Sequence, residues 1–197
     1  MSIVRKVRAV ERLFKTLEKD IQKLQSKTGI HCLEGCVICC TTPKIMATSI
    51  EFYPLAFHLF KTHQAEAILS KIEQNSNIST CPLLSSIIYG ENKPGCTFYE
   101  QRGLICRLFA YTHQTDKQGK RRIITCKTIK LNQPNEVEIA NKILCEKPIG
   151  PKASDYYSRL QFIDYQKANQ LYPIAEAIKL AIESVLSYYQ YRGKKAV

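Results

Sequence analysis

The segment from His31 to Cys40, HCLEGCVICC, places four cysteines within ten residues and ends on an adjacent pair. The chain has nine cysteines in 197 residues, more than is usual for an intracellular protein but fewer than a small secreted disulfide scaffold carries. In a reducing compartment, thiols clustered in this way favour a bound metal over disulfides. The sequence therefore predicts a metal site built from thiolates.

The spacing inside this segment limits how the metal is held. Cys36 and Cys39 form a CxxC knuckle, in which a tight turn aims two thiolates at one metal. Cys40 follows directly and cannot point the same way without distortion of the backbone. We expect Cys40 to reach a second metal or another atom of a cluster. Four thiolates close a tetrahedral zinc site and also hold a cubane iron-sulfur cluster, so the ligand type leaves both open.

Eight thiols would supply two four-thiolate sites, or one site with spare ligands. We expect these eight to be Cys32, Cys36, Cys39, Cys40, Cys81, Cys96, Cys106 and Cys126. The ninth, Cys145, lies on a predicted helix among Ile139, Ile143 and Leu144, where a thiol packs like a small apolar side chain. We therefore expect Cys145 to be a core residue.

Three elements of the sequence resemble the YkgJ-type cysteine-cluster family, the CxxCxxCC zinc- or iron-chelating domain. They are HCLEGCVICC, CPLL at 81–84 and CTFYEQRGLICRLF at 96–109, and the resemblance extends from about Cys32 to Cys126. It implies metal binding through the eight cysteines named above. Tyr99, Arg102 and Arg107 occupy the family's polar positions.

Two features depart from the family's pattern. Gly103 stands where the family has a proline after Arg102, and three residues rather than two separate Cys32 from Cys36. The first departure would loosen the turn before Cys106.

Apolar spacing predicts helices at both ends of the chain. A stripe from Ile3 to Leu24 predicts one long helix closed by Gly29, and residues 154–171 and 174–191 are periodic as well. The Thr48–Glu51 capping box precedes a further helical pattern. We expect polar loops at 74–80 and 85–95, around Cys81 and Cys96, and a short helix at 136–144.

The segment 108–129 has two β-prone runs joined by Asp116–Gly119, which predicts a hairpin. If Asp116 pairs with Lys120, Cys126 lies opposite Ala110, on the same face as Cys106 but four residues away, or roughly 13 Å. These two thiols then do not touch, unless a bulge shortens the distance or they serve different metals.

The expected fold is thus a mostly helical α+β domain, in which a cysteine-rich loop centre with a β-hairpin is clamped by N- and C-terminal helices. We expect a single domain over residues 1–197, made of an N-terminal helix (1–30), a cysteine-cluster region (31–130) and a C-terminal helical region (131–197). The helical stripe at the N-terminus packs within the domain or forms the seam of a homodimer, so the protein is expected to be a monomer or such a dimer.

The net charge of +12 suits nucleic acid, an anionic membrane surface or an acidic partner protein. The densest basic stretch is 117–130, with Phe109 and Tyr111 nearby as stacking platforms for RNA or single-stranded DNA; a solvated edge hairpin is the alternative. The first residues contain no continuous apolar run that would form a signal peptide or membrane span. We expect a cytoplasmic protein.

We expect an iron-sulfur cluster, 4Fe-4S by preference, with a redox, sensing or cluster-dependent accessory role, because the Cys39–Cys40 pair and the surplus of thiols suit a polynuclear centre. The alternative is a structural zinc protein acting as a basic interaction module. His31 is a candidate ligand or supporting donor, and His113 is expected in solvent near the hairpin tip. A Cys/His nucleophile lacks a third, orienting group, and enzymatic activity stays open.

Overall fold

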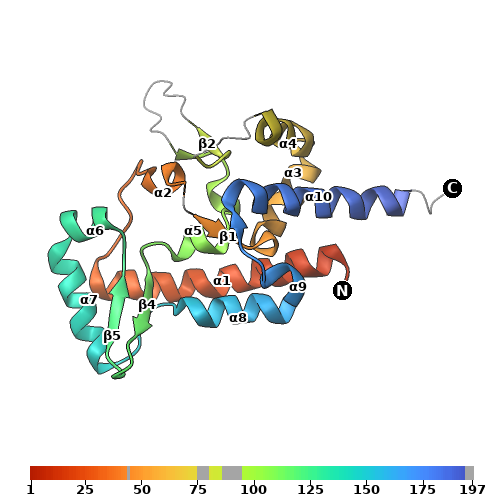
Figure 1. The fold of residues 1–197 in the computed structure, drawn as a ribbon. Coiled ribbons are helices and arrows are strands. Elements are labelled where there is room, and N and C mark those ends of the chain that lie inside the picture. Colours follow the sequence, from red (N-terminus) through yellow and green to blue (C-terminus); the bar gives the residue numbers. More distant parts are fainter. Residues whose placement is uncertain (44, 75–79, 86–94, 194–197) are drawn as a thin grey trace. The chain divides into compact units, whose positions relative to one another are not determined.

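The computed structural model describes residues 1–43, 45–74, 80–85 and 95–193. The chain divides into two compact units. Unit 1 comprises Met1–Glu11, Gly35–Leu104 and Leu160–Val197, and unit 2 comprises Arg12–Glu34 and Ile105–Arg159. Both are mostly helical with short antiparallel strand pairs (Figure 1), which confirms the predicted α+β class. The organisation of 1–197 as one domain stays a prediction.

Most elements lie within one unit. Those of unit 1 are α2 (Ile38–Thr41), β1 (Met46–Ala47), η1 (Ser49–Phe52), α3 (Tyr53–Lys61), α4 (Ala65–Gln74), β2 (Leu84–Ser85), β3 (Gly95–Cys96), η2 (Tyr99–Gln101), α9 (Tyr165–Ala168), β6 (Tyr172–Pro173) and α10 (Ile174–Gly193). Those of unit 2 are β4 (Thr112–Thr115), β5 (Arg121–Ile124), α6 (Lys127–Asn132) and α7 (Pro134–Glu146). Three helices cross the boundary between the units: α1 (Ile3–Thr28), α5 (Leu104–Leu108) and α8 (Ala153–Ile163).

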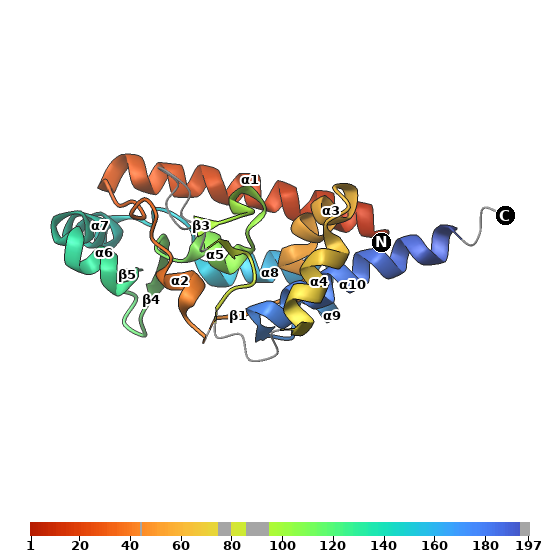
Figure 2. The same ribbon diagram turned by 90° about the horizontal axis from the view of Figure 1, so that it is seen from above.

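The core of unit 1 is built around the predicted capping box. Glu51 accepts hydrogen bonds from the backbone N–H (2.7 Å) and the hydroxyl (3.1 Å) of Thr48. The polar groups at the N-terminus of η1 are therefore hydrogen-bonded. Ile50 and Phe52 of η1 and Leu55, Ala56 and Leu59 of α3 are fully buried, and α10 packs along both elements (Figure 2). The helical periodicity at residues 174–191 is thereby explained, since its buried positions are Ala177, Ile178, Ala181, Ile182 and Val185.

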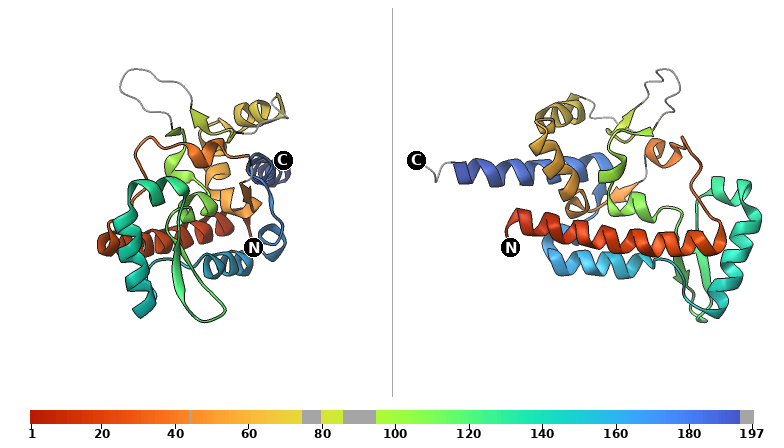
Figure 3. Two further views of the ribbon diagram at one scale, coloured as in Figure 1. Left: turned by 60° about the vertical axis from the view of Figure 1, so that its left-hand side comes forward. Right: turned by 180° about the vertical axis from the view of Figure 1, so that it is seen from behind.

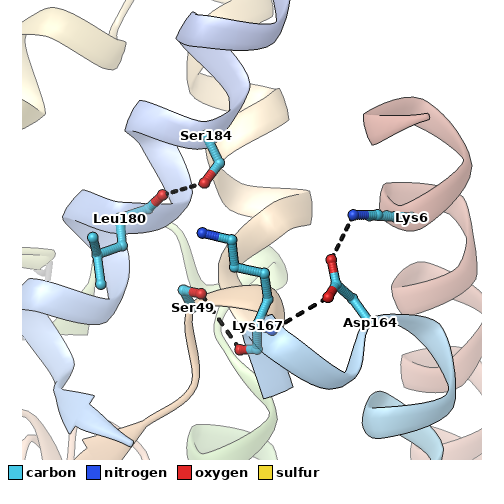
Figure 4. Close-up of polar contacts among 6 residues, drawn as sticks. All are labelled: Lys6, Ser49, Asp164, Lys167, Leu180 and Ser184. Atoms are coloured by element: carbon cyan, nitrogen blue, oxygen red, sulfur yellow. Dashed lines mark hydrogen bonds and ion pairs between the residues drawn. The ribbon is translucent and has the colours of Figure 1, made fainter. Parts of the chain in front are cut away.

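A polar junction in unit 1 separates α8 from α9 (Figure 4). The Asp164 carboxylate caps α9 by accepting the Lys167 N–H (3.2 Å) and pairs with the Lys6 ammonium. The Ser49 hydroxyl donates to the Lys167 carbonyl at 3.4 Å. Because Asp164 starts a new helix, the periodic segment predicted over 154–171 is divided into two helices.

Gly103 lies against the interior of unit 1. A Cβ atom at this position would come within 2.7 Å of the Phe52 ring and 3.0 Å of the Glu51 carboxylate. Phe52 and Glu51 are both fully buried and have little room to retreat. The glycine that stands in place of the family's proline therefore allows the Phe52 ring to lie close to the backbone.

Unit 2 contains the predicted hairpin in the predicted register. Thr112 pairs with Ile124 and Thr115 with Arg121, and Gly119 has a φ of +82° in the turn. The strand β5 packs on α7 (Figure 3). The Ile123 N–H donates to the Asn141 side chain at 3.0 Å.

The strands are shorter than predicted, and the two cysteines expected on them lie elsewhere. Cys106 is on α5, Ala110 turns the chain with a φ of +108°, and Cys126 is the N-cap of α6. The prediction that Cys106 and Cys126 lie about 13 Å apart on one strand face was therefore wrong. Capping and turn formation outweigh the β-propensity of these short apolar runs.

Three side chains differ from their predicted environments. Cys145 is exposed, because Ala140 and Leu144 are the α7 residues that face the core. His113 is buried with 6% of its surface exposed, since its position in β4 points toward the covered side of the hairpin. Tyr111 is also buried and offers no stacking platform.

Some predictions fall outside the described residues. Most of the loops expected at 74–80 and 85–95 belong to this group, because residues 75–79 and 86–94 are not described. Within the described part of the chain, no helix is both long and apolar enough to cross a membrane.

Candidate metal centre

The helix α2 carries the adjacent cysteines. It is a single turn in which the N–H groups of Cys40 and Thr41 donate to the Val37 carbonyl at 2.8 and 3.0 Å. The thiols of Cys39 and Cys40 are partly exposed and share a hydrogen bond. The two side chains point in different directions, as expected for neighbouring positions on a helix. Their sulfur atoms still lie close enough to share the hydrogen bond.

Backbone hydrogen bonds bring Cys81 to the same helix. The Cys81 N–H donates to the Cys40 carbonyl at 2.7 Å, although 40 positions separate the segments in the sequence. A turn then closes with the Leu84 N–H on the Cys81 carbonyl at 3.0 Å. In the short β2–β3 pair, Leu84 lies opposite Cys96. The structure thus gathers Cys39, Cys40, Cys81 and Cys96 in one region of unit 1, which we call the thiol cluster.

The ionisation of the thiol cluster is uneven. The hydrogen bond from Cys40 lowers the pKa of Cys39 to about 6, with burial opposing this shift and the Arg102 charge assisting it. The same hydrogen bond, together with burial, raises the pKa of Cys40, whose thiol is the donor. Burial raises the pKa of Cys81 to about 11 and also raises that of Cys96. The Cys39–Cys40 pair is therefore the part of the thiol cluster that loses a proton most readily.

Two cations lie beside the thiol cluster. Arg102 lowers the pKa values of Cys39 and Cys96 and stacks on Tyr99, with 3.7 Å between its guanidinium carbon and the ring centroid. Lys71, on α4, donates to the Pro82 carbonyl at 2.7 Å. The resemblance to the family identified Arg102 as a site residue. Lys71 was missed, because nothing in its helical sequence context distinguishes it from a surface lysine.

The remaining predicted ligands are divided between the units. Cys36 belongs to unit 1, close in sequence to α2, and is partly exposed. Cys32, Cys106 and Cys126 belong to unit 2. The Cys126 thiol accepts the Ile129 N–H at 3.4 Å and so caps the N-terminus of α6.

Tyr111 and Arg107 hold the segments on which the unit 2 cysteines lie. The Tyr111 hydroxyl accepts the Cys32 N–H at 2.8 Å. Arg107, the neighbour of Cys106, pairs with Glu18 at 3.3 Å and lies over the Phe14 ring at 4.7 Å. His31 bonds the Gly29 carbonyl at 2.9 Å through its Nδ1 atom, and its backbone is held by Gln133.

Across residues 1–43, 45–74, 80–85 and 95–193, no three His, Cys, Asp or Glu side chains are arranged as a closed group that could hold a metal ion. The thiol cluster is close enough for its members to perturb one another's pKa values, but its sulfur atoms do not form a tetrahedron. The donor chemistry nevertheless fits a thiophilic metal, because all four groups are thiols, one of them ionised near neutral pH.

Helical units with clustered cysteines define a cysteine-cluster, metal-binding class of protein. The sequence model of the family described as "CxxCxxCC: Putative zinc- or iron-chelating domain" matches residues 31–137, which is more than half of the chain. The protein belongs to this family. Comparisons with curated proteins and with solved structures gave no match.

Proposed function

We propose that the protein binds an iron-sulfur cluster, 4Fe-4S by preference, and serves a redox, sensing or cluster-dependent accessory role in the cytoplasm. The observation that carries this proposal is the contact between the adjacent Cys39 and Cys40 thiols, with Cys81 and Cys96 beside them. Two neighbouring sulfur atoms are better suited to different irons of one cluster than to two corners of a single zinc tetrahedron.

The thiol cluster is the proposed principal ligand set, and Cys36 is a further ligand on the same segment. Cys32, Cys106 and Cys126 are proposed as further metal ligands because they match the family's cysteine pattern. When bound, an iron-sulfur cluster supplies one-electron redox chemistry. Arg102 keeps positive charge beside Cys39 and Cys96, which favours their thiolate forms, while burial of Cys81 and Cys96 limits the access of water.

Zinc is the second candidate, and a specific feature of the thiol cluster favours it. Its four thiols match the ligand count of a closed tetrahedral site. In that case the metal would fold the segments around α2, β2 and β3, and the protein would act as a basic interaction module.

Anaerobic purification, followed by a visible spectrum and by iron, zinc and sulfide analysis, tests the proposal. An iron-sulfur protein is expected to be brown, with iron and acid-labile sulfide in equal amounts. A colourless protein with stoichiometric zinc and no labile sulfide would establish the zinc alternative instead.

Single substitutions then test the ligands. Cys39→Ser and Cys40→Ser are each expected to lower the metal content, because serine is a poor ligand for thiophilic metals. Cys145→Ser is the matched control, since Cys145 is exposed and lies outside the ligand set. Equal metal content in all three variants would refute the role of the thiol cluster.

A further inference from the structure

Unit 2 carries a dense group of cations on the hairpin and the helix that follows it. Between residues 112 and 130 the sequence has six lysines and arginines and a single acidic residue, Asp116. The Asp116 carboxylate accepts the N–H groups of Gln118 (3.0 Å) and Lys120 (2.8 Å), so it serves to shape the turn. The segment therefore has a strong local excess of positive charge.

Five of these cations are exposed, and we call them the basic face. Its members are Lys117, Lys120, Arg122, Lys127 and Lys130. The sixth cation, Arg121, points to the opposite side of β5, where it donates to the Leu144 carbonyl at 3.3 Å. The strand register explains this separation, because Arg122 shares a side with Gln114 while the His113–Ile123 pair is buried on the other.

The basic face has no acidic partner within the described part of the chain. None of its five members forms an ion pair there. On the neighbouring α7, Glu138 is paired with Lys142 at 2.7 Å. The charges of the basic face thus remain available to an external polyanion.

The dimensions of the basic face fit a phosphate backbone. Its cations lie in the turn, on β5 and on α6, which follow one another along the chain in Figure 1. Six residues of extended chain between Lys120 and Cys126 span about 20 Å. Duplex DNA presents one negative charge per about 1.7 Å of its axis. A face of this length can therefore meet several phosphates at once.

Of the two aromatic side chains expected to stack on bases, only Phe109 is exposed, and it precedes β4 instead of lying on the elements that carry the basic face. Tyr111 is buried, and its hydroxyl is engaged by Cys32 and Gln25. Single-strand binding gains much of its energy from bases stacked on aromatic rings, and duplex RNA is recognised partly through its 2′-hydroxyls. The hairpin and α6 carry no Phe, Tyr or Trp of their own, so a face built from lysines and arginines matches the phosphate backbone of duplex DNA.

We propose that the basic face docks on the phosphate backbone of duplex DNA without sequence preference. The inference is independent of which metal the thiol cluster holds. Five phosphate contacts predict a slope of about −4.5 for log K against log salt concentration.

The test uses the full-length protein with its bound metal and a fluorescent DNA duplex of random sequence, with anisotropy measured between about 50 and 200 mM salt. The triple variant Lys117→Gln, Lys120→Gln, Arg122→Gln is expected to reduce the slope by about 2.7 and to weaken binding by roughly 500-fold at 0.1 M salt. These side chains are exposed and are not among the proposed metal ligands, so metal content and circular dichroism should stay unchanged.

The control variant Lys15→Gln, Lys19→Gln, Lys23→Gln removes the same charge from exposed positions of α1. It is expected to keep most of the affinity. Equal losses in the two triple variants would overturn the proposal, because net charge alone would then govern binding. Tighter binding of single-stranded RNA or of an acidic polypeptide than of duplex DNA would overturn it as well.

Discussion

The replacement Gly103→Ala tests the packing that distinguishes this chain from its family's pattern. The added Cβ would meet the Phe52 ring at 2.7 Å, whereas ordinary contacts begin at 3.4 Å, so ring or backbone must move by about 0.7 Å. Overpacking of this kind costs about 1–3 kcal/mol. The alanine also raises the free energy of unfolding by about 0.4–1 kcal/mol, because it lowers the conformational entropy of the unfolded chain. The free energy of unfolding should therefore fall by about 1–2 kcal/mol.

Urea denaturation followed by circular dichroism measures this change, with metal content matched between proteins because bound metal raises apparent stability. Gly95→Ala is the control, since a Cβ there meets no atom within 4 Å. In the double variant Gly103→Ala, Phe52→Leu, the smaller side chain should relieve the clash, so the two losses should not add. Equal stability of the two alanine variants, or simple additivity in the double variant, would refute the argument.

Three further substitutions address stability and its pH dependence. Burial lowers the pKa of His113, whose Nδ1 atom has no hydrogen-bond partner among the described residues. The free energy of unfolding should therefore decline as the pH falls below about 6.5. In denaturation measured from pH 7 to about 5, His113→Phe should flatten that decline. Tyr156→Phe removes the 2.6 Å hydrogen bond to the Asp20 carboxylate and should lower the free energy of unfolding by about 1–3 kcal/mol, with an unchanged midpoint contradicting this. Burial raises the pKa of Asp164, but the hydrogen bond from Lys6 and the helix cap outweigh it and the net pKa is lowered. The Asp164→Asn variant should therefore be less stable at neutral pH, and the difference should vanish as acid protonates the carboxyl group; a difference that persists in acid would contradict the assignment.

Features that depend on near neighbours in the chain could be predicted from the sequence. The apolar stripe of α1, the Thr48–Glu51 capping box, and the turn and register of the β4–β5 hairpin all follow from local spacing and turn chemistry. The family's cysteine pattern could likewise be recognised, because the order and spacing of thiols are properties of the sequence.

Tertiary structure decided which side chains meet and which face the core. Only the fold brings the Cys81 N–H to the Cys40 carbonyl, places the Phe52 ring on Gly103 and turns Leu144 rather than Cys145 inward. Helix N-capping by Cys126 also outweighed a β-prone run. The physical reason is that contacts between distant segments, and the exact rotation of each helix, depend on how side chains of many elements fill one core.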